Sequence, residues 1–391
     1  MLEKAIRLLQ PSVRSAVPPF MVMDVMAAAR RLEDEGRRIV HMEVGQPAVG
    51  APATAIAAAR AALGSGTLGY TEALGVGSLR QRIARAYADW HGVDVEADRI
   101  VVTTGSSSGF ILAFLAAFEA GDRVAVALPG YPPYRHILSA LGCEPVLVET
   151  SAQTGWSLTA ESLLAQHRAR PLKGLIIASP ANPTGTMIPP AAFRELIRCA
   201  EDAGIMVISD EIYHGLDYAF AAESAVRVSS DAIIINSFSK YFCMTGWRIG
   251  WMVVPKALVR AVERLQQNLA ISVPTLSQIA AEAAFDGIAE LTRVKQGYEE
   301  NRRILLAGLP RAGLDAFLPA DGAFYLYTDV SRFSDDSFAF ATRLLKDAGV
   351  AATPGVDFDP LRGRNFLRLC YAGAREDMHD AVERIGSWLK G

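Results

Sequence analysis

The sequence predicts an α/β fold, with a mostly parallel sheet of seven strands covered by helices and a smaller α+β region after it. Short apolar runs alternate with helical stretches through the middle of the chain, as expected for strands joined by crossover helices. After about Val254 the pattern changes to long helices and two further strand-like runs. The 391 residues, 51% of them hydrophobic, are enough for two domains.

Apolar runs between turn residues give the expected strands, and alanine-rich or amphipathic stretches give the helices between them. The expected strands are Ile100–Thr104, Arg123–Leu128, Pro145–Val148, Gly174–Ser179, Ile205–Ser209, Ala232–Asn236 and Ile249–Val254. The expected helices are Thr54–Leu63, Gly109–Glu119, Pro133–Leu141, Pro190–Ala203 and Thr275–Phe285.

The end of the chain is expected to form the smaller domain. Its segments are the helices Ala257–Leu269 and Thr275–Leu306, the strands Ala323–Thr328 and Asn365–Cys370, and the final helix Arg375–Leu389. We expect residues 1–45 to form an N-terminal arm and part of the small domain, residues 46–285 the large domain, and residues 286–391 the rest of the small domain.

Composition excludes several classes of function. The net charge of −3 gives no electrostatic reason to bind nucleic acid or an anionic membrane. No apolar run reaches the roughly 18 residues of a membrane span. The N-terminal residues 1–10 lack the continuous apolar core of a secretory signal and suggest a short amphipathic helix or arm. Four widely spaced cysteines and six scattered histidines predict a reduced, cytoplasmic setting without a disulfide framework or metal site.

Lys240 is the most informative residue. It lies just past a buried apolar run, in Ser237-Phe238-Ser239-Lys240, and Arg248 follows eight residues later. Partial burial lowers the pKa of an amine and makes it nucleophilic toward an aldehyde. Ser237 and Arg248 are donors that suit a phosphate. Together these residues point to an aldehyde that carries a phosphate, which is pyridoxal phosphate.

Small polar residues and an aromatic residue follow the first two strands of the expected sheet. Ser106 and Ser107 lie in Thr103-Thr104-Gly105-Ser106-Ser107-Ser108-Gly109, which opens a helix whose N-terminus favours an anion. Tyr131 follows the next strand, where it can stack on a planar ring. Taken alone, each motif also fits an ordinary helix cap or a turn fixed by proline.

Three later motifs add an amide, a carboxylate and a guanidinium. Asn182 lies in the turn Ser179-Pro180-Ala181-Asn182-Pro183-Thr184-Gly185 and can present its amide to a ring oxygen. Asp210 ends a buried strand, where a protonated pyridine nitrogen would pair it, and Tyr213 can share the target of Asn182. Arg368 lies inside an apolar strand, so its partner is either a substrate carboxylate or an internal Asp or Glu.

In this order and at these spacings the motifs resemble the class I/II aminotransferase family of fold-type I pyridoxal phosphate enzymes. The resemblance extends from Gly45-Gln46-Pro47 to Arg368. It implies that Lys240 forms the internal aldimine and later moves the proton, and that Asp210 keeps the pyridine nitrogen protonated. It also implies that Asn182 and Tyr213 hydrogen-bond the phenolic oxygen of the ring.

The resemblance assigns the other residues as well. Tyr131 would stack on the ring, and Arg368, with Asn182 and Gly45, would bind the substrate. Tyr70 looks like the tyrosine that reaches the phosphate across a dimer interface, which implies a homodimer with shared active sites. The phosphate would be bound by Ser106, Ser107, Ser237 and Arg248.

The implied reaction moves the amino group of an L-amino acid to a 2-oxo acid by a ping-pong mechanism through pyridoxamine phosphate. Ser107 stands where bacterial members that prefer aspartate often carry lysine, and Val17 to Phe20 suggest an apolar lid. These features favour a neutral donor such as alanine, a branched-chain or an aromatic amino acid. The alternatives are a carbon–sulfur β-lyase, a cyclase or a decarboxylase on the same cofactor, and, more remotely, a non-enzymatic sensor module.

Overall fold

The computed structural model describes residues 10–66 and 68–391. The described chain forms a seven-stranded sheet in the order β2-β8-β7-β6-β5-β3-β4. Its strands are β2 (Ile100–Thr103), β3 (Arg123–Leu128), β4 (Glu144–Glu149), β5 (Gly174–Ala178), β6 (Met206–Asp210), β7 (Ile233–Ser237) and β8 (Gly250–Val253). Strand β8 runs antiparallel to both of its neighbours, whereas the other pairs are parallel. The predicted fold class is confirmed, and each strand agrees with its expected bounds to within one residue at each end.

Both faces of this sheet are buried, because successive strand residues enter two different cores. Ile234 of β7 packs in one core and its neighbours Ile233 and Ile235 pack in the other, and Val102 and Val101 of β2 divide in the same way. The first core is covered by α4 (Gly77–His91), α7 (Ala160–Ala169), α8 (Pro190–Asp202) and α10 (Thr275–Ala284), and the second by α5 (Gly105–Ala117), α6 (Pro132–Leu141) and α9 (Lys256–Leu269).

A third core joins the two ends of the described chain. It contains Val40 and Met42 together with Leu305, Leu309 and Ile385. The strands around it are β1 (Val40–His41) paired with β10 (Val350–Ala351), and β11 (Thr353–Pro354), β12 (Phe366–Cys370) and β9 (Tyr325–Asp329) in a second sheet. The helices are α2 (Met21–Asp34), α11 (Ile288–Ala312), α12 (Ser337–Arg343) and α13 (Arg375–Lys390). The domain boundaries at residues 45 and 285 stay a prediction.

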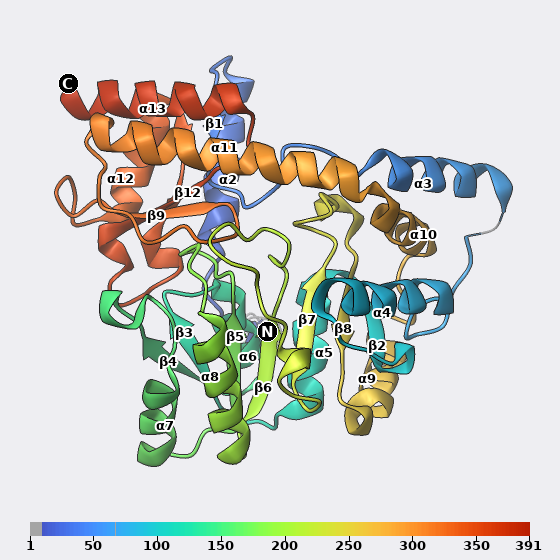
Figure 1. The fold of residues 1–391 in the computed structure, drawn as a ribbon. Helices are drawn as coiled ribbons and strands as arrows, with labels where there is room; N and C mark the ends of the chain where they lie inside the picture. Colours follow the sequence, from blue (N-terminus) through green and yellow to red (C-terminus); the bar gives the residue numbers. More distant parts are fainter. Residues whose placement is uncertain (1–9, 67) are drawn as a thin grey trace, which may run out of the picture.

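Figure 1 shows α11 (orange) crossing the top of the molecule from the C-terminal strands to α10, beside α3 (Ala53–Ser65). The prediction of one continuous helix from Thr275 to Leu306 was wrong. The 3-10 turn Phe285–Gly287 divides this segment into α10 and α11. A Cβ atom on Gly287 would lie 2.6 Å from Cβ of Pro52, so the chain needs glycine where it turns past that residue. Helices α2, α4, α7 and α12 are not among the expected helices.

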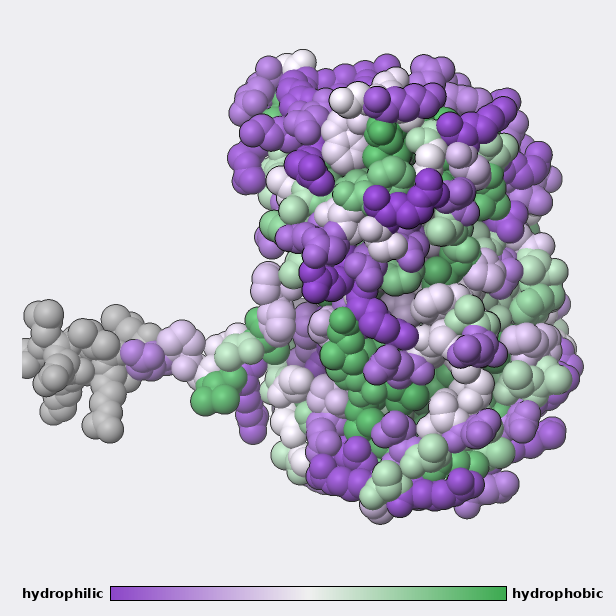
Figure 2. Space-filling model, turned by 90° about the vertical axis from the view of Figure 1, so that its left-hand side faces the viewer, coloured by the Kyte–Doolittle hydropathy of each residue, from purple (hydrophilic) through white to green (hydrophobic). Residues whose placement is uncertain are grey.

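Residues 10–19 are exposed, and Figure 2 shows the start of the described chain extending outward from the body of the molecule. The short helix or arm expected over residues 1–10 lies outside the described residues, apart from Gln10. In the part of the chain that the structure describes, no helix has both the length and the apolar character needed to cross a membrane.

Candidate active site

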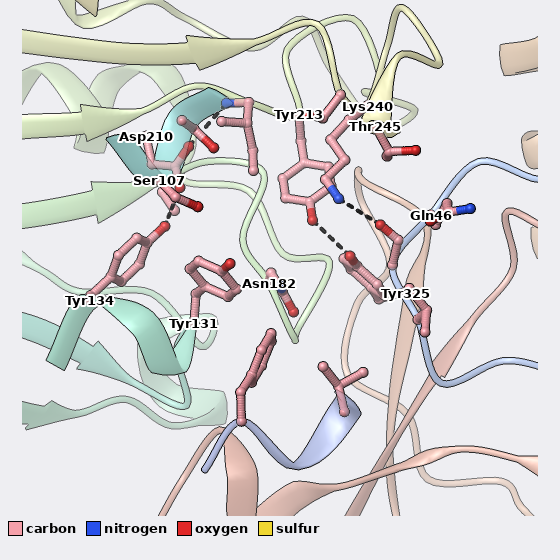
Figure 3. Close-up of a pocket in the computed structure, with 18 of the residues that line it drawn as sticks. Gln46, Ser107, Tyr131, Tyr134, Asn182, Asp210, Tyr213, Lys240, Thr245 and Tyr325 are labelled. Carbon is pink, nitrogen blue, oxygen red and sulfur yellow. Dashed lines mark hydrogen bonds between the residues drawn. The ribbon is translucent and has the colours of Figure 1, made fainter. Parts of the chain in front are cut away.

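A cavity of about 490 Å³ lies beyond the carboxyl ends of β2, β3, β5, β6 and β7, and Figure 3 shows its side chains. This is the edge at which open α/β sheets bind their ligands. Ten of the twelve predicted site residues line it, and the exceptions are Ser237 and Tyr70. The lining consists of Phe20, Val22, Met23, Val44, Gly45, Gln46, Ser106, Ser107, Tyr131, Tyr134, Ala178, Asn182, Asp210, Ile212, Tyr213, Ser239, Lys240, Thr245, Gly246, Arg248, Tyr325 and Arg368.

The amine of Lys240 lies on one side of the cavity, beside Tyr213 (Figure 3). Strand β7 ends at Ser237, and the chain then turns so that Lys240 Nζ donates a 2.6 Å hydrogen bond to the carbonyl oxygen of Gly45 (Figure 3). Burial lowers the pKa of this amine to about 8, and the nearby Arg368 and Arg248 act in the same direction. A substantial fraction of the amine is therefore neutral near pH 8 and able to attack an aldehyde.

The carboxylate of Asp210 lies on the opposite side of the cavity, at the end of β6. Its Oδ1 accepts a 3.1 Å hydrogen bond from the backbone N–H of Ile212, and its Oδ2 accepts one from the hydroxyl of Tyr134. Burial raises the pKa of Asp210 to about 6, although both hydrogen bonds oppose that rise. Tyr134 was not predicted as a site residue, although it lies one helical turn after Tyr131 at the start of α6.

A candidate anion site lies at the N-terminus of the 13-residue helix α5, at the edge of the same cavity. Ser106 and Ser107 lie in its first turn, and the guanidinium of Arg248 packs against Gly105. Gly105 has φ +73°, a conformation that favours glycine, and a Cβ atom there would lie 2.4 Å from Arg248 Nη2 and displace the guanidinium. The helix dipole, the hydroxyls and the guanidinium together favour a phosphate.

Ser237 does not line the cavity, although the sequence predicts it as a phosphate-binding residue. The Ser237 hydroxyl is buried, donates to the carbonyl oxygen of Ile249 at 3.1 Å and lies 2.9 Å from the Ser239 hydroxyl. Ser239 lines the cavity instead. The predicted role of Ser237 in phosphate binding therefore stays a prediction, whereas Ser239 is a lining residue that sequence reasoning missed.

Arg368 lines the cavity from β12, in the sheet of β9, β11 and β12, and its guanidinium is held in place by several contacts. Its Nη1 donates to Asn182 Oδ1 at 2.8 Å, and its Nη2 donates to the carbonyl oxygen of Glu43. The rings of Tyr325 and Phe358 lie 4.4 and 4.6 Å from the guanidinium carbon. No carboxylate of the described residues pairs with Arg368, and its Nε has no partner there. The internal ion pair considered from the sequence is thus absent from the described residues.

Aromatic and apolar side chains form the remaining wall. Tyr131 contacts Phe20 edge-to-face at 5.9 Å between ring centres, and burial raises the pKa of Tyr131 to about 12. Phe20, Val22 and Met23, at the start of α2, also line the cavity. The backbone N–H of Val22 donates to Asp357 Oδ2 at 3.4 Å, which ties this end of α2 to the 3-10 turn Gly355–Asp357 that follows β11.

Tyr70 lies away from the cavity of its own chain. Its side chain is 83% exposed. The flanking residues are held to the start of α10 and the chain just before it, since Gly69 accepts a hydrogen bond from the Thr275 hydroxyl and the Thr71 N–H donates to the Ser272 hydroxyl. Tyr70 therefore presents its ring outward from a fixed segment.

These groups fit pyridoxal phosphate. Lys240 suits the aldehyde, the buried Asp210 suits a protonated pyridine nitrogen, and Arg248 with the N-terminus of α5 suits the phosphate. The carboxylate of Asp210, buried and without a cationic partner among the described residues, is the group that most needs such a ligand.

The proteins that this chain resembles are aminotransferases. The family model described as aminotransferase class I and II matches residues 37–385. The chain is 51% identical to the valine–pyruvate aminotransferase of Mycobacterium tuberculosis over 97% of its own length and 98% of that protein. It is 35% identical to the (5-formylfuran-3-yl)methyl phosphate transaminase of Methanocaldococcus jannaschii over 95% of this chain and 96% of that protein.

Solved structures of aminotransferases have the same fold as this chain. An aminotransferase from Mycobacterium tuberculosis superposes with a TM-score of 0.95 at 50% identity, covering 97% of this chain and 99% of that one. The aspartate aminotransferase of Thermus thermophilus with maleate gives a TM-score of 0.91 at 32% identity, again over 97% of this chain and 99% of that one. These relatives are named as aminotransferases, which supports the leading prediction over the lyase. The chain therefore belongs to the class I and II aminotransferase family and is a pyridoxal phosphate-dependent aminotransferase.

Proposed function

We propose that this aminotransferase takes a neutral, apolar L-amino acid as its donor and a 2-oxo acid as its acceptor. The observation that carries the proposal is the distribution of charge around the cavity. Among the described lining residues the cationic ones are Lys240, Arg248 and Arg368. The first suits the aldehyde, the second the phosphate and the third one substrate carboxylate, so no cation remains for a second carboxylate.

The apolar wall supports the same substrate class. Phe20, Val22 and Met23 face the cavity, and Ser107 stands where aspartate-preferring members often have lysine. Burying an aliphatic or aromatic side chain against such a wall is favourable, whereas burying an unpaired carboxylate is costly. The relative at 51% identity is named for valine and pyruvate, which fits a branched-chain donor.

We propose the following roles for the residues that bind and orient. Arg368 binds the substrate α-carboxylate, and the backbone of Gly45 and the amide of Asn182 contact the substrate beside it. Arg248 binds the phosphate together with Ser106, Ser107 and Ser237. Tyr131 packs on the ring face. The fixed guanidinium of Arg368 needs little reorganisation to bind a carboxylate, which favours both affinity and orientation.

When bound, pyridoxal phosphate supplies an electron sink that acidifies the Cα–H bond of the amino acid. Asp210 maintains the proton on the pyridine nitrogen. Asn182 and Tyr213 would donate hydrogen bonds to the phenolic oxygen of the ring. Lys240 Nζ would hold the cofactor covalently at rest; as a free amine it would accept the Cα proton as general base and donate it to the cofactor carbon as general acid. Its lowered pKa of about 8 suits both directions of transfer near neutral pH.

We also propose that the enzyme is a homodimer in which Tyr70 reaches the phosphate of the partner subunit. The support is the exposure of Tyr70 beside other exposed apolar side chains on neighbouring segments, Leu63, Leu68, Leu269 and Ile271. A patch of this kind is typical of an interface. The four free cysteines fit a reduced, cytoplasmic setting.

The substrate class is tested by the first half-reaction. The holoenzyme is mixed with valine, alanine, phenylalanine, aspartate or glutamate without any oxo acid, and the change in cofactor absorbance is followed. We expect the apolar donors to react at least about tenfold more efficiently than the dicarboxylates. Equal or greater efficiency with aspartate would contradict the proposal.

A further inference from the structure

Tyr325 is a buried residue that lines the cavity and is not among the predicted site residues. It is the first residue of β9, next to the turn that carries Ala323 at φ +57°. Its side chain is 1% exposed, and its hydroxyl lies 2.7 Å from the hydroxyl of Tyr213, which is 3% exposed (Figure 3). In the described structure each of these hydroxyls has the other as its one hydrogen-bond partner.

The backbone of Gly45 holds the Tyr325 hydroxyl in place. A Cβ atom on Gly45 would lie 1.8 Å from the Tyr325 hydroxyl oxygen, so the glycine backbone packs directly against it. The carbonyl of the same glycine accepts the hydrogen bond from Lys240 Nζ. The hydroxyl thus lies between the chain that contacts the Lys240 amine and the tyrosine proposed to contact the ring oxygen.

The ring of Tyr325 has a second contact. Its centre lies 4.4 Å from the guanidinium carbon of Arg368, close enough for a cation–π interaction. Phe358 contacts the same guanidinium at 4.6 Å. The two rings pack against the guanidinium and fix its plane. The hydrogen bonds from its nitrogens to Asn182 and Glu43 fix its orientation within that plane.

We infer that Tyr325 is a positioning residue that directs the hydroxyl proton of Tyr213 into the cavity and holds the plane of Arg368 for the substrate carboxylate. Each tyrosine hydroxyl has one proton. If Tyr325 donates to Tyr213, the Tyr213 proton is free to point at the ring oxygen of the cofactor, and the chain of two hydrogen bonds strengthens both. The first half of this inference rests on the proposed role of Tyr213.

The consequence appears in the spectrum of the bound cofactor. A hydrogen bond to the phenolic oxygen stabilises its anionic form and lowers the pKa at which the Lys240-bound cofactor loses its proton. Tyr325→Phe removes the hydroxyl and retains the ring. In a spectrophotometric pH titration of the holoenzyme we expect it to raise this pKa by about 0.5 to 1, as the loss of one net hydrogen bond would.

The double variant tests whether Tyr325 acts through Tyr213. We expect Tyr213→Phe to raise the spectral pKa by more than Tyr325→Phe does, and Tyr213→Phe with Tyr325→Phe to match Tyr213→Phe alone. The matched control is Tyr298→Phe, which removes another buried hydroxyl of the same core, near Cys243 and outside the cavity lining, and leaves the spectral pKa unchanged.

The ring contact has its own measurement. Binding of 3-methylbutanoate, a carboxylate without an amino group, is followed by the perturbation of the cofactor spectrum. We expect Tyr325→Phe to keep the Kd within about twofold, and Tyr325→Leu to raise it about tenfold because the cation–π contact with Arg368 is lost.

The outcomes separate the two hypotheses. If Tyr213→Phe leaves the spectral pKa unchanged, the proposed role of Tyr213 fails and the hydroxyl half of the inference fails with it. If Tyr213→Phe shifts it but Tyr325→Phe does not, or if the two shifts add in the double variant, the inference alone is overturned. Equal Kd values for the Phe and Leu variants would overturn the half that concerns Arg368.

Discussion

The Nη1 atom of Arg368 donates a 2.8 Å hydrogen bond to the amide oxygen of Asn182. The two residues lie 186 positions apart in the sequence, one in β12 and the other in the turn after β5. With its oxygen held by Arg368, the Asn182 amide has its N–H groups left for an acceptor in the cavity. One contact therefore orients both the carboxylate site and a donor toward the proposed position of the ring.

Arg368→Ala is expected to raise the KM of α-amino acid donors about 100-fold or more, because a buried charge pair with the substrate carboxylate is lost. Arg368→Lys should recover little of this, since an ammonium lacks the planar fork. Kinetics with simple amines that have no carboxylate provide the control. Equal losses for amines and amino acids would show that Arg368 does not bind the carboxylate.

Asp210→Asn is expected to stabilise the cofactor-free protein at neutral pH. Burial raises the pKa of Asp210 from 3.8 to about 6, so the folded state loses stability as the pH rises from 3.8 through 6. The asparagine variant has no such penalty, and its advantage should be on the order of 2 kcal/mol at pH 8 and markedly smaller at pH 5.

Denaturant unfolding of the apoprotein at the two pH values measures this difference. Asp202→Asn, at an exposed position at the end of α8, is the matched control and should show no comparable dependence on pH. An Asp210→Asn variant that is less stable than the native protein at pH 8 would contradict the interpretation.

Phe20→Ala is expected to lower kcat/KM for valine and other apolar donors about tenfold, because the variant loses part of the apolar wall. The affinity for the cofactor should stay unchanged. Met26→Ala, also on α2 but outside the lining, is the control. If valine and alanine react with the Phe20 variant as they do with the native enzyme, Phe20 does not contact the donor side chain.

Tyr70→Phe is expected to raise the Kd of pyridoxal phosphate about tenfold or more, through loss of a hydrogen bond to a charged group. Hybrid dimers test whether the contact crosses the interface. A Tyr70→Phe subunit paired with a Lys240→Ala subunit should regain one site of native affinity, because the intact tyrosine belongs to the partner. A hybrid that shows only the weakened affinity, or an active and fully loaded monomer, would contradict the shared site.

The main sheet was predictable from the sequence because its strands are continuous apolar runs bounded by turn residues. Ile233–Ser237, for example, is fully buried on both faces, so its pattern is unambiguous. Eight of the ten predicted site residues that line the cavity were also predictable in this way, since side chains that follow the carboxyl ends of such strands must meet at one edge, whereas Gly45 and Arg368 lie outside this sheet. Helix α4 was not predicted, although its apolar residues Leu79, Ile83 and Ala86 recur at the spacing of one helix face and are buried.

Other site residues were not predictable, because their roles depend on contacts between distant segments. Tyr325 is one of two tyrosines in β9, and the role inferred for it depends on its hydroxyl contact with Tyr213, 112 positions away. Tyr134 likewise acts on Asp210, 76 positions later in the chain. The carbonyls of Glu43 and Gly45, which accept from Arg368 and Lys240, carry no side-chain signal at all.

The covalent attachment of the cofactor to Lys240 is tested most directly by borohydride reduction of the holoenzyme, followed by proteolysis and peptide mass mapping. We expect to find the reduced cofactor on the peptide that contains Lys240. Lys240→Ala should abolish this modified peptide and lower turnover by a factor of roughly 10⁴ or more. Lys256→Ala, at an exposed lysine paired with Glu96, should change neither. Modification of a different lysine, or of none, would contradict the account of this site.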